Sequence, residues 1–118
     1  RPLGQFKNIV PMYPGATIQS SMNFKDGSQI VFTTKDDSKK IFNFFKNELT
    51  RNGWIVYLER YGKDIVLDQN GKSPFVEKMA TENTAFIALY KENMGLMIDT
   101  DLIEEKTDAT LYIGHTLE

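Results

Sequence analysis

Apolar residues recur with the period of a helix over one long segment, which runs from Asp37 to Trp54. The apolar positions that share one stripe of this segment are Ile41, Phe42, Phe45 and Leu49. They fall within an arc of about 100°, which is the width of a helix face that packs on a core. Asp37 can cap the helix N-terminus, and Gly53 followed by Trp54 is typical of a helix stop. We therefore predict one long helix over about 37–52, with Phe45 and Trp54 deeply buried.

The segments on either side of the helix alternate between apolar and polar residues, which is the period of a β-strand. The segments that we expect to form strands are 17–24, 29–34, 54–60, 64–68, 84–91, 95–101 and 109–115. Short turns such as Asp26-Gly27 join most of them, and a polar crossing is expected over 102–108. The order β-β-α-β-β-β-β predicts an α+β fold. In this fold an antiparallel sheet of five to seven strands carries the helix on one face.

Alternation along the predicted strands divides their large apolar residues between the two faces of the sheet. The residues predicted to face the helix are Val56, Leu58, Ile87, Leu89, Ile98, Leu111 and Ile113. The residues predicted to face away from it are Ile55, Tyr57, Phe86, Tyr90, Met97 and Tyr112. A sheet face in contact with water normally carries polar side chains, so the aromatic face requires an explanation.

Two explanations fit the aromatic face, and the sequence leaves both open. The face can bind a partner, because aromatic residues and methionine are enriched in interfaces. Alternatively, the irregular segment 70–83, with Phe75, Val76 and Met79, can cover it, because monomers rarely expose large apolar patches. On the first hypothesis the binding residues are Tyr57, Phe86, Tyr90, Met97 and Tyr112, together with Phe44 of the helix. The partner would be a protein, a small apolar ligand or a second copy of the chain.

Composition narrows the class of protein. The 118 residues, of which 41% are hydrophobic and 25% charged, have the size and composition of one globular domain, which we expect over 1–116. A net charge of −2 gives no general attraction for nucleic acid. The chain has no cysteine, which excludes disulfides and thiolate sites, and no apolar run approaches the roughly 18 residues of a membrane span. We expect no nucleic-acid partner, no cofactor and no transmembrane segment in this chain.

A group of carboxylates supports an alternative function that depends on a bound metal ion. Asp99, Asp101 and Glu104 lie in the most acidic stretch of the chain, and oxygen ligands of this kind bind Ca²⁺ or Mg²⁺. The alternative function is therefore a small metal-dependent enzyme or metal-binding protein that uses the 99–108 carboxylates. The single histidine, His115, is not accompanied by a G-x-S-x-G nucleophile elbow. We thus predict no catalytic residue, and the leading hypothesis is a non-catalytic binding or protein-interaction domain.

A string of local signals resembles the small "YPGA…FY…L…GW" domains of bacterial envelope proteins and predicted lipoproteins, which are mostly of unknown function. The signals are Tyr13-Pro14-Gly15-Ala16, the stretch from Phe42 to Leu49, and Asn52-Gly53-Trp54, with Phe44-Phe45 in place of the more usual Phe-Tyr pair. The resemblance implies a location in the cell envelope or periplasm, with the cytoplasm as the alternative. Residues 1–8 are expected to form a loose lead-in, and 117–118 resemble a tag scar. The chain begins without Met, which fits a trimmed signal or lipid-anchor segment, a processed tag or a domain cut from a longer protein equally well.

Overall fold

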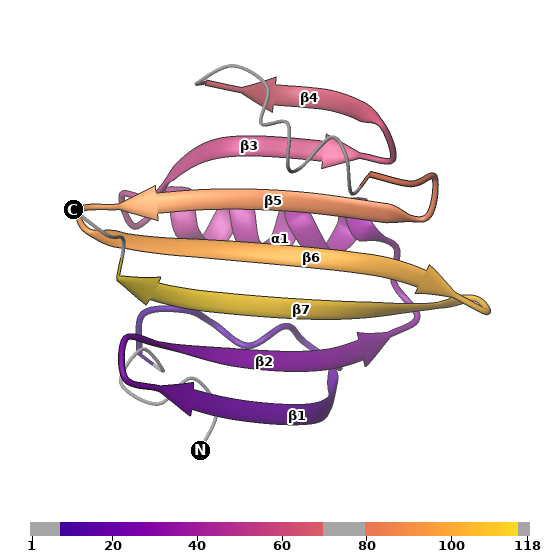
Figure 1. Ribbon diagram of the computed structural model, residues 1–118, viewed down its shortest axis with the longest axis horizontal. Helices are drawn as coiled ribbons and strands as arrows, with labels where there is room; N and C mark the ends of the chain where they lie inside the picture. The colour runs from indigo at the N-terminus through magenta and orange to yellow at the C-terminus, as the bar shows by residue number, and fades with distance from the viewer. Residues whose placement is uncertain (1–7, 70–79, 116–118) are drawn as a thin grey trace.

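The computed structural model of the protein describes residues 8–69 and 80–115. Its elements in chain order are β1 (Thr17–Phe24), β2 (Gly27–Thr34), α1 (Ser38–Thr50), β3 (Ile55–Tyr61), β4 (Asp64–Asp68), β5 (Thr84–Lys91), β6 (Met94–Ile103) and β7 (Lys106–His115). The strands form one sheet in the order β1-β2-β7-β6-β5-β3-β4, and every neighbouring pair is antiparallel. The predicted α+β fold is confirmed (Figure 1).

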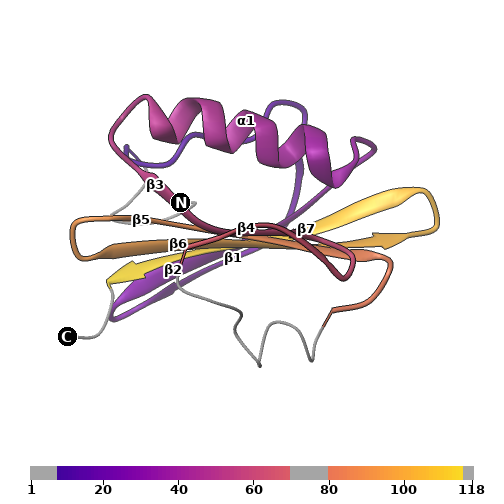
Figure 2. The same ribbon diagram turned by 90° about the horizontal axis from the view of Figure 1, so that it is seen from above.

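The described chain forms two layers, the sheet and α1, which lies across one side of it (Figure 2). We call the face under α1 the inner face and the opposite face the outer face. The large residues that are fully buried between the layers include Ile30, Phe32, Ile41, Phe42, Phe45, Leu49, Ile87, Leu89, Leu96, Ile98 and Ile113. The predicted burial of Phe45 and Trp54 is confirmed, because they are 0% and 3% exposed.

Both ends of α1 follow from local side-chain and backbone chemistry. The Asp37 carboxylate accepts a hydrogen bond from the Lys40 backbone N–H at 2.9 Å, as an N-cap should. At the other end Gly53 adopts a φ of 90°, and the Trp54 N–H donates to the Leu49 carbonyl at 3.1 Å. This Schellman-type stop turns Trp54 back onto the core, so that β3 starts directly after it.

The prediction that Leu58 faces the helix is wrong, because β3 contains a bulge. Val56 pairs with Leu89 on β5, but Leu58 pairs with Ala88, so Tyr57 is an extra residue on β3. Since Leu89 belongs to the core, its neighbour Ala88 faces outward, and Leu58 faces outward with it. A bulge of this kind reverses the alternation of the residues that follow it.

The bulge turns a carboxylate toward α1, where the structure pairs it. Glu59 is 4% exposed and accepts hydrogen bonds from Lys46 Nζ at 3.0 and 3.1 Å. The Tyr61 hydroxyl donates to the same carboxylate at 2.5 Å. Burial of the Tyr61 ring, followed by this hydrogen bond, raises the pKa of Tyr61. The buried charge of Glu59 is therefore both hydrogen-bonded and neutralised, as a buried carboxylate requires.

The predicted polar crossing at 102–108 is instead a tight hairpin. Strand β6 continues to Ile103, which pairs directly with Lys106 at the start of β7. Glu104 and Glu105 connect the strands with φ values of 47° and 68°. Two residues with positive φ match the twist of a two-residue hairpin turn. Glutamate seldom adopts this conformation, so the sequence carried no turn signal here.

The lead-in before β1 is fixed to the body by Tyr13 and Val10. Both side chains are buried in the core. The Tyr13 ring stacks on Phe32 with 5.7 Å between ring centroids and meets Phe44 edge-on at 5.4 Å. Its hydroxyl donates to Asp36 Oδ2 at 2.5 Å, next to the N-terminus of α1. The lead-in and the start of the helix are therefore held to each other by one hydrogen bond.

Replacing Tyr13→Phe should raise the pKa of Asp36, because the Tyr13 hydrogen bond is the main cause that lowers it. A carboxyl group with a lowered pKa stabilises the fold above its unfolded pKa, near about 4. That stabilisation is lost as the pH falls through the folded pKa. The variant should lose part of this acid dependence, and NMR titration of the Asp36 carboxyl measures the shift. An Asp36 pKa that is the same in the variant and the wild type would contradict the assignment.

Candidate ligand-binding pocket

The strand register aligns the outer-face residues in rows that cross the sheet. One row, from β3 to β1, contains Leu58, Ala88, Met97, Tyr112, Gln29 and Met22. The next row contains Ile55, Tyr90, Gly95, Gly114, Gly27 and Phe24. Three successive glycines in the second row have no side chain, which leaves room on the outer face beside the tyrosines. The outer face is therefore hollowed where β6 and β7 meet.

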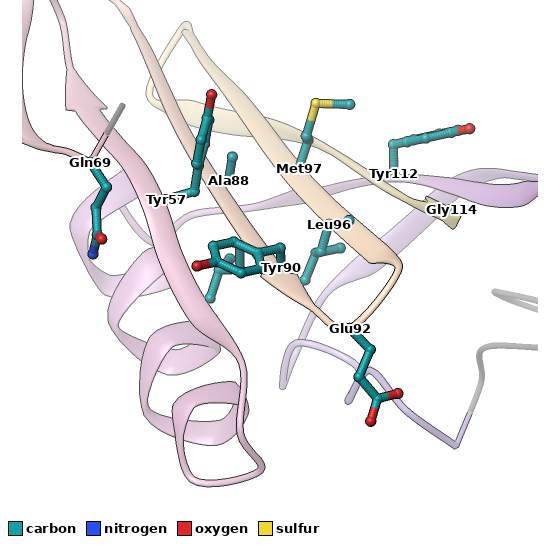
Figure 3. A pocket seen from close by; sticks show the side chains of 11 residues that line it. Tyr57, Gln69, Ala88, Tyr90, Glu92, Leu96, Met97, Tyr112 and Gly114 are labelled. Atoms are coloured by element: carbon teal, nitrogen blue, oxygen red, sulfur yellow. The ribbon is translucent and has the colours of Figure 1, made fainter. Parts of the chain in front are cut away.

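A pocket of about 540 Å³ opens at this position (Figure 3). The described residues that line it are Tyr57, Gln69, Ala88, Leu89, Tyr90, Glu92, Gly95, Leu96, Met97, Tyr112 and Gly114. They come from β3, β5, β6 and β7, from the turn between β5 and β6, and from the residue that follows β4. The volume is in the range of sites that hold small molecules, roughly 300–1,000 Å³.

The glycines allow one tyrosine to lie flat on the sheet. A Cβ atom on Gly114 would stand 3.0 Å from the Tyr112 hydroxyl oxygen and 2.8 Å from the Asp26 carbonyl oxygen. A Cβ atom on Gly27 would also stand 3.0 Å from the Tyr112 hydroxyl. The side chain of Tyr112 therefore extends over both glycines. Glycine inside a strand is typical of such close approaches. Gly95, the neighbour of Gly114, exposes its backbone in the pocket.

The bulge in β3 positions Tyr57, which forms a wall of the pocket together with Tyr90. The ring of Tyr57 meets that of Tyr90 edge-to-face, with centroids 6.5 Å apart and an interplanar angle of 82°. Gln69 holds the bulge from the end of β4: its side-chain amide donates to the Val56 carbonyl and its backbone N–H to the Tyr57 carbonyl, each at 3.1 Å. These two hydrogen bonds hold the bulge, and with it Tyr57, in place.

The structure brings together four of the six residues predicted to bind a partner. Tyr57, Tyr90, Met97 and Tyr112 line the pocket, and Tyr90 and Met97 remain 38% and 41% exposed. Phe86 lies on the same face, one row away. Phe44 lies in the other layer, where it packs against the inner-face core. The alternative cover, segment 70–83, falls largely on residues 70–79, which lie outside the described residues.

Seven of the eleven described lining residues were not anticipated: Gln69, Ala88, Leu89, Glu92, Gly95, Leu96 and Gly114. The two glycines did leave a signal, because a glycine inside an alternating strand pattern often marks the close approach of another group. No comparable signal exists for Gln69 and Glu92. Each is placed by the pairing of strands that are distant in sequence, so their neighbourhood follows from the register and not from local spacing.

A buried arginine lies beside the pocket and does not line it. Arg60, turned outward by the bulge, is 3% exposed and donates to the Gly62 carbonyl and, at 3.4 Å, to the Thr84 hydroxyl. Burial raises the pKa of Asp99, and the nearby charge of Arg60 opposes that rise. Burial likewise lowers the pKa of Arg60, against the influence of Asp99. The two opposite charges thus offset each other next to the pocket.

The predicted metal ligands do not form a cluster. Asp99 and Asp101 lie at alternate positions of β6 on the outer face, whereas Glu104 is in the turn that follows. Over residues 8–69 and 80–115, no three His, Cys, Asp or Glu side chains are placed to hold a metal ion. In the same part of the chain, no helix is both long and apolar enough to cross a membrane.

Comparison with known protein families gives a match to part of the chain. A family model described as START domain-like matches residues 16–64, which is less than half of the chain. The matched segment contains β1, β2, α1 and β3, so of the described pocket side chains it includes Tyr57 alone. No curated protein and no solved structure matches the chain. The observed α+β fold is consistent with a START-like fold, and the similarity suggests a ligand-binding domain.

Proposed function

We propose that the protein is a non-catalytic domain that binds a small apolar ligand in the outer-face pocket. The observation that carries this proposal is an apolar hollow of about 540 Å³ on a sheet face that water contact would normally make polar. Tyr57, Tyr90, Met97 and Tyr112 surround the hollow. The match to a START domain-like family supports the general class of ligand-binding domain.

The lining indicates which ligands fit best. The bare backbone at Gly95 admits a flat group close to the sheet, and the neighbouring tyrosine rings offer faces and edges for aromatic contact. Gln69 and the tyrosine hydroxyls can form a few directional hydrogen bonds. Glu92 is the one charged side chain among the described lining residues. A neutral or cationic ligand with a flat apolar body is therefore favoured over an anion of the same shape.

Filling the pocket with Gly95→Leu should weaken binding strongly without unfolding the protein. The added side chain would occupy the hollow, and glycine is a poor strand residue, so the strand itself should not be weakened. Binding is measured by the fluorescence of the neutral dye N-phenylnaphthylamine. The variant should bind the dye at least about tenfold more weakly, a loss of about 1.4 kcal/mol in binding free energy.

The matched control is Asp101→Leu, which adds an apolar side chain to the same face of the same strand, outside the pocket lining. This control should bind the dye as the wild type does. A sulfonated analogue of the dye should bind the wild type more weakly than the neutral dye. Saturable binding that survives Gly95→Leu, or no binding to the wild type, would contradict the proposed site.

We also propose that the protein works in the bacterial cell envelope. The support is the resemblance of the Tyr13-Pro14-Gly15-Ala16 turn, the helix and the Asn52-Gly53-Trp54 stop to domains of envelope proteins. Fractionation of source cells with an antibody against this domain is expected to recover it with the membranes or in the periplasm. Recovery in the cytoplasmic fraction would exclude this location, and it would leave the pocket proposal unaffected.

A further inference from the structure

Within residues 8–69 and 80–115, the strand at one edge of the sheet has one paired side and one unpaired side. Among the described residues β1 pairs with β2 alone, and all eight residues of β1 are exposed. Three of them are large and apolar: Ile18 is 40% exposed, Met22 54% and Phe24 46%. An edge strand presents unpaired backbone N–H and C=O groups, which can pair with a strand of another chain.

The two edges of the sheet differ in their protection against pairing. Strand β4, at the other edge, has five residues and begins and ends with a charge, at Asp64 and Asp68. Short length and charged side chains are the usual means by which proteins prevent edge pairing. Strand β1 has eight residues, TIQSSMNF, and none is charged. Only its register shift between Ile18 and Ser20 interrupts an otherwise regular edge.

We propose that β1 is a self-association edge, which pairs antiparallel with β1 of a second copy of this chain. The regular part of the strand beyond the register shift is 20–24, and its middle residue is Met22. A two-fold axis at Met22 would place this residue opposite Met22 of the second copy, and Ser20 opposite Phe24. Because i and i+2 share a face, all of these side chains would lie on the outer faces of both copies.

Charge and apolar contact both favour a second copy as the occupant. An antiparallel self-pair brings each residue opposite another residue of the same strand, and like charges in such positions are destabilising. In β1 no such opposition can arise, since the strand is uncharged. The exposed Met22 and Phe24 would gain contacts, and Phe24 already contacts Tyr112 with 6.3 Å between ring centroids. The inference rests on the edge strand and is independent of ligand binding in the pocket.

Sedimentation velocity of the full chain over a range of concentrations tests this inference. The wild type should show a reversible equilibrium between monomer and dimer. Met22→Lys and Met22→Glu should each raise the dimer dissociation constant about fivefold or more, because like charges would then meet across the axis. An equimolar mixture of the two variants should restore association, because opposite charges now face each other.

The control is Val66→Lys, which adds a charge at the other edge, where Val66 is 62% exposed. This variant should associate as the wild type does, and all variants should melt at the wild-type temperature at a concentration low enough for the wild type to be monomeric. A wild type that remains monomeric throughout the concentration range would overturn the proposal. This is the result expected if β1 pairs with a different protein. A dimer that persists in both Met22 variants, or a mixture that fails to associate, would overturn it as well.

Discussion

The structure depends on the unequal sizes of its two layers. The helix α1 has 13 residues, and at 1.5 Å per residue it is about 20 Å long. Seven strands about 4.8 Å apart span about 29 Å, and the sheet has two faces to cover. α1 and the lead-in residues Val10 and Tyr13 cover the inner face, where the large apolar side chains gather. The residues of the outer face must therefore be explained by a role other than packing under this helix.

One inserted residue in β3 connects the two faces. Tyr57 is an extra residue in the pairing with β5. Val56 and Leu58 would share one face in a regular strand, but here they point to opposite faces of the sheet. The bulge turns Glu59 toward α1. There Lys46 neutralises the Glu59 charge, and the Tyr61 hydroxyl donates a hydrogen bond to the Glu59 carboxylate. Toward the outer face it places Leu58, and Tyr57 meets Tyr90 at the pocket wall. A local irregularity thus supports a polar network in the core and a tyrosine wall on the surface.

The features that were predictable from the sequence are those with local causes. The helix and its limits follow from Asp37, the apolar stripe and Gly53, each of which acts within one or two turns. Strand alternation likewise separated the faces wherever strands are regular. The outward position of Leu58 could not be predicted, since a bulge is defined by a partner strand. The turn at Glu104-Glu105 was also hidden, because glutamate has no preference for positive φ.

The pocket shows the same division between local and non-local information. Its tyrosines and Met97 could be assigned to one face by alternation alone. Its depth depends on Gly95 standing beside Gly114, which is a matter of register between β6 and β7. Gln69 becomes a pocket residue because it is hydrogen-bonded to the bulge in β3. A sequence can therefore indicate which side chains share a face, whereas a hollow among them emerges only when the strands are paired.

Ligand binding on the outer face is tested most directly by mapping it on the folded protein. Two-dimensional amide NMR spectra of the wild type, titrated with N-phenylnaphthylamine, report which residues the dye approaches. Shifts should concentrate at Tyr90, Gly95, Met97 and Gly114, and saturate together. Shifts that concentrate instead around Phe44 and α1, or a spectrum that the dye leaves unchanged, would contradict binding in the outer-face pocket.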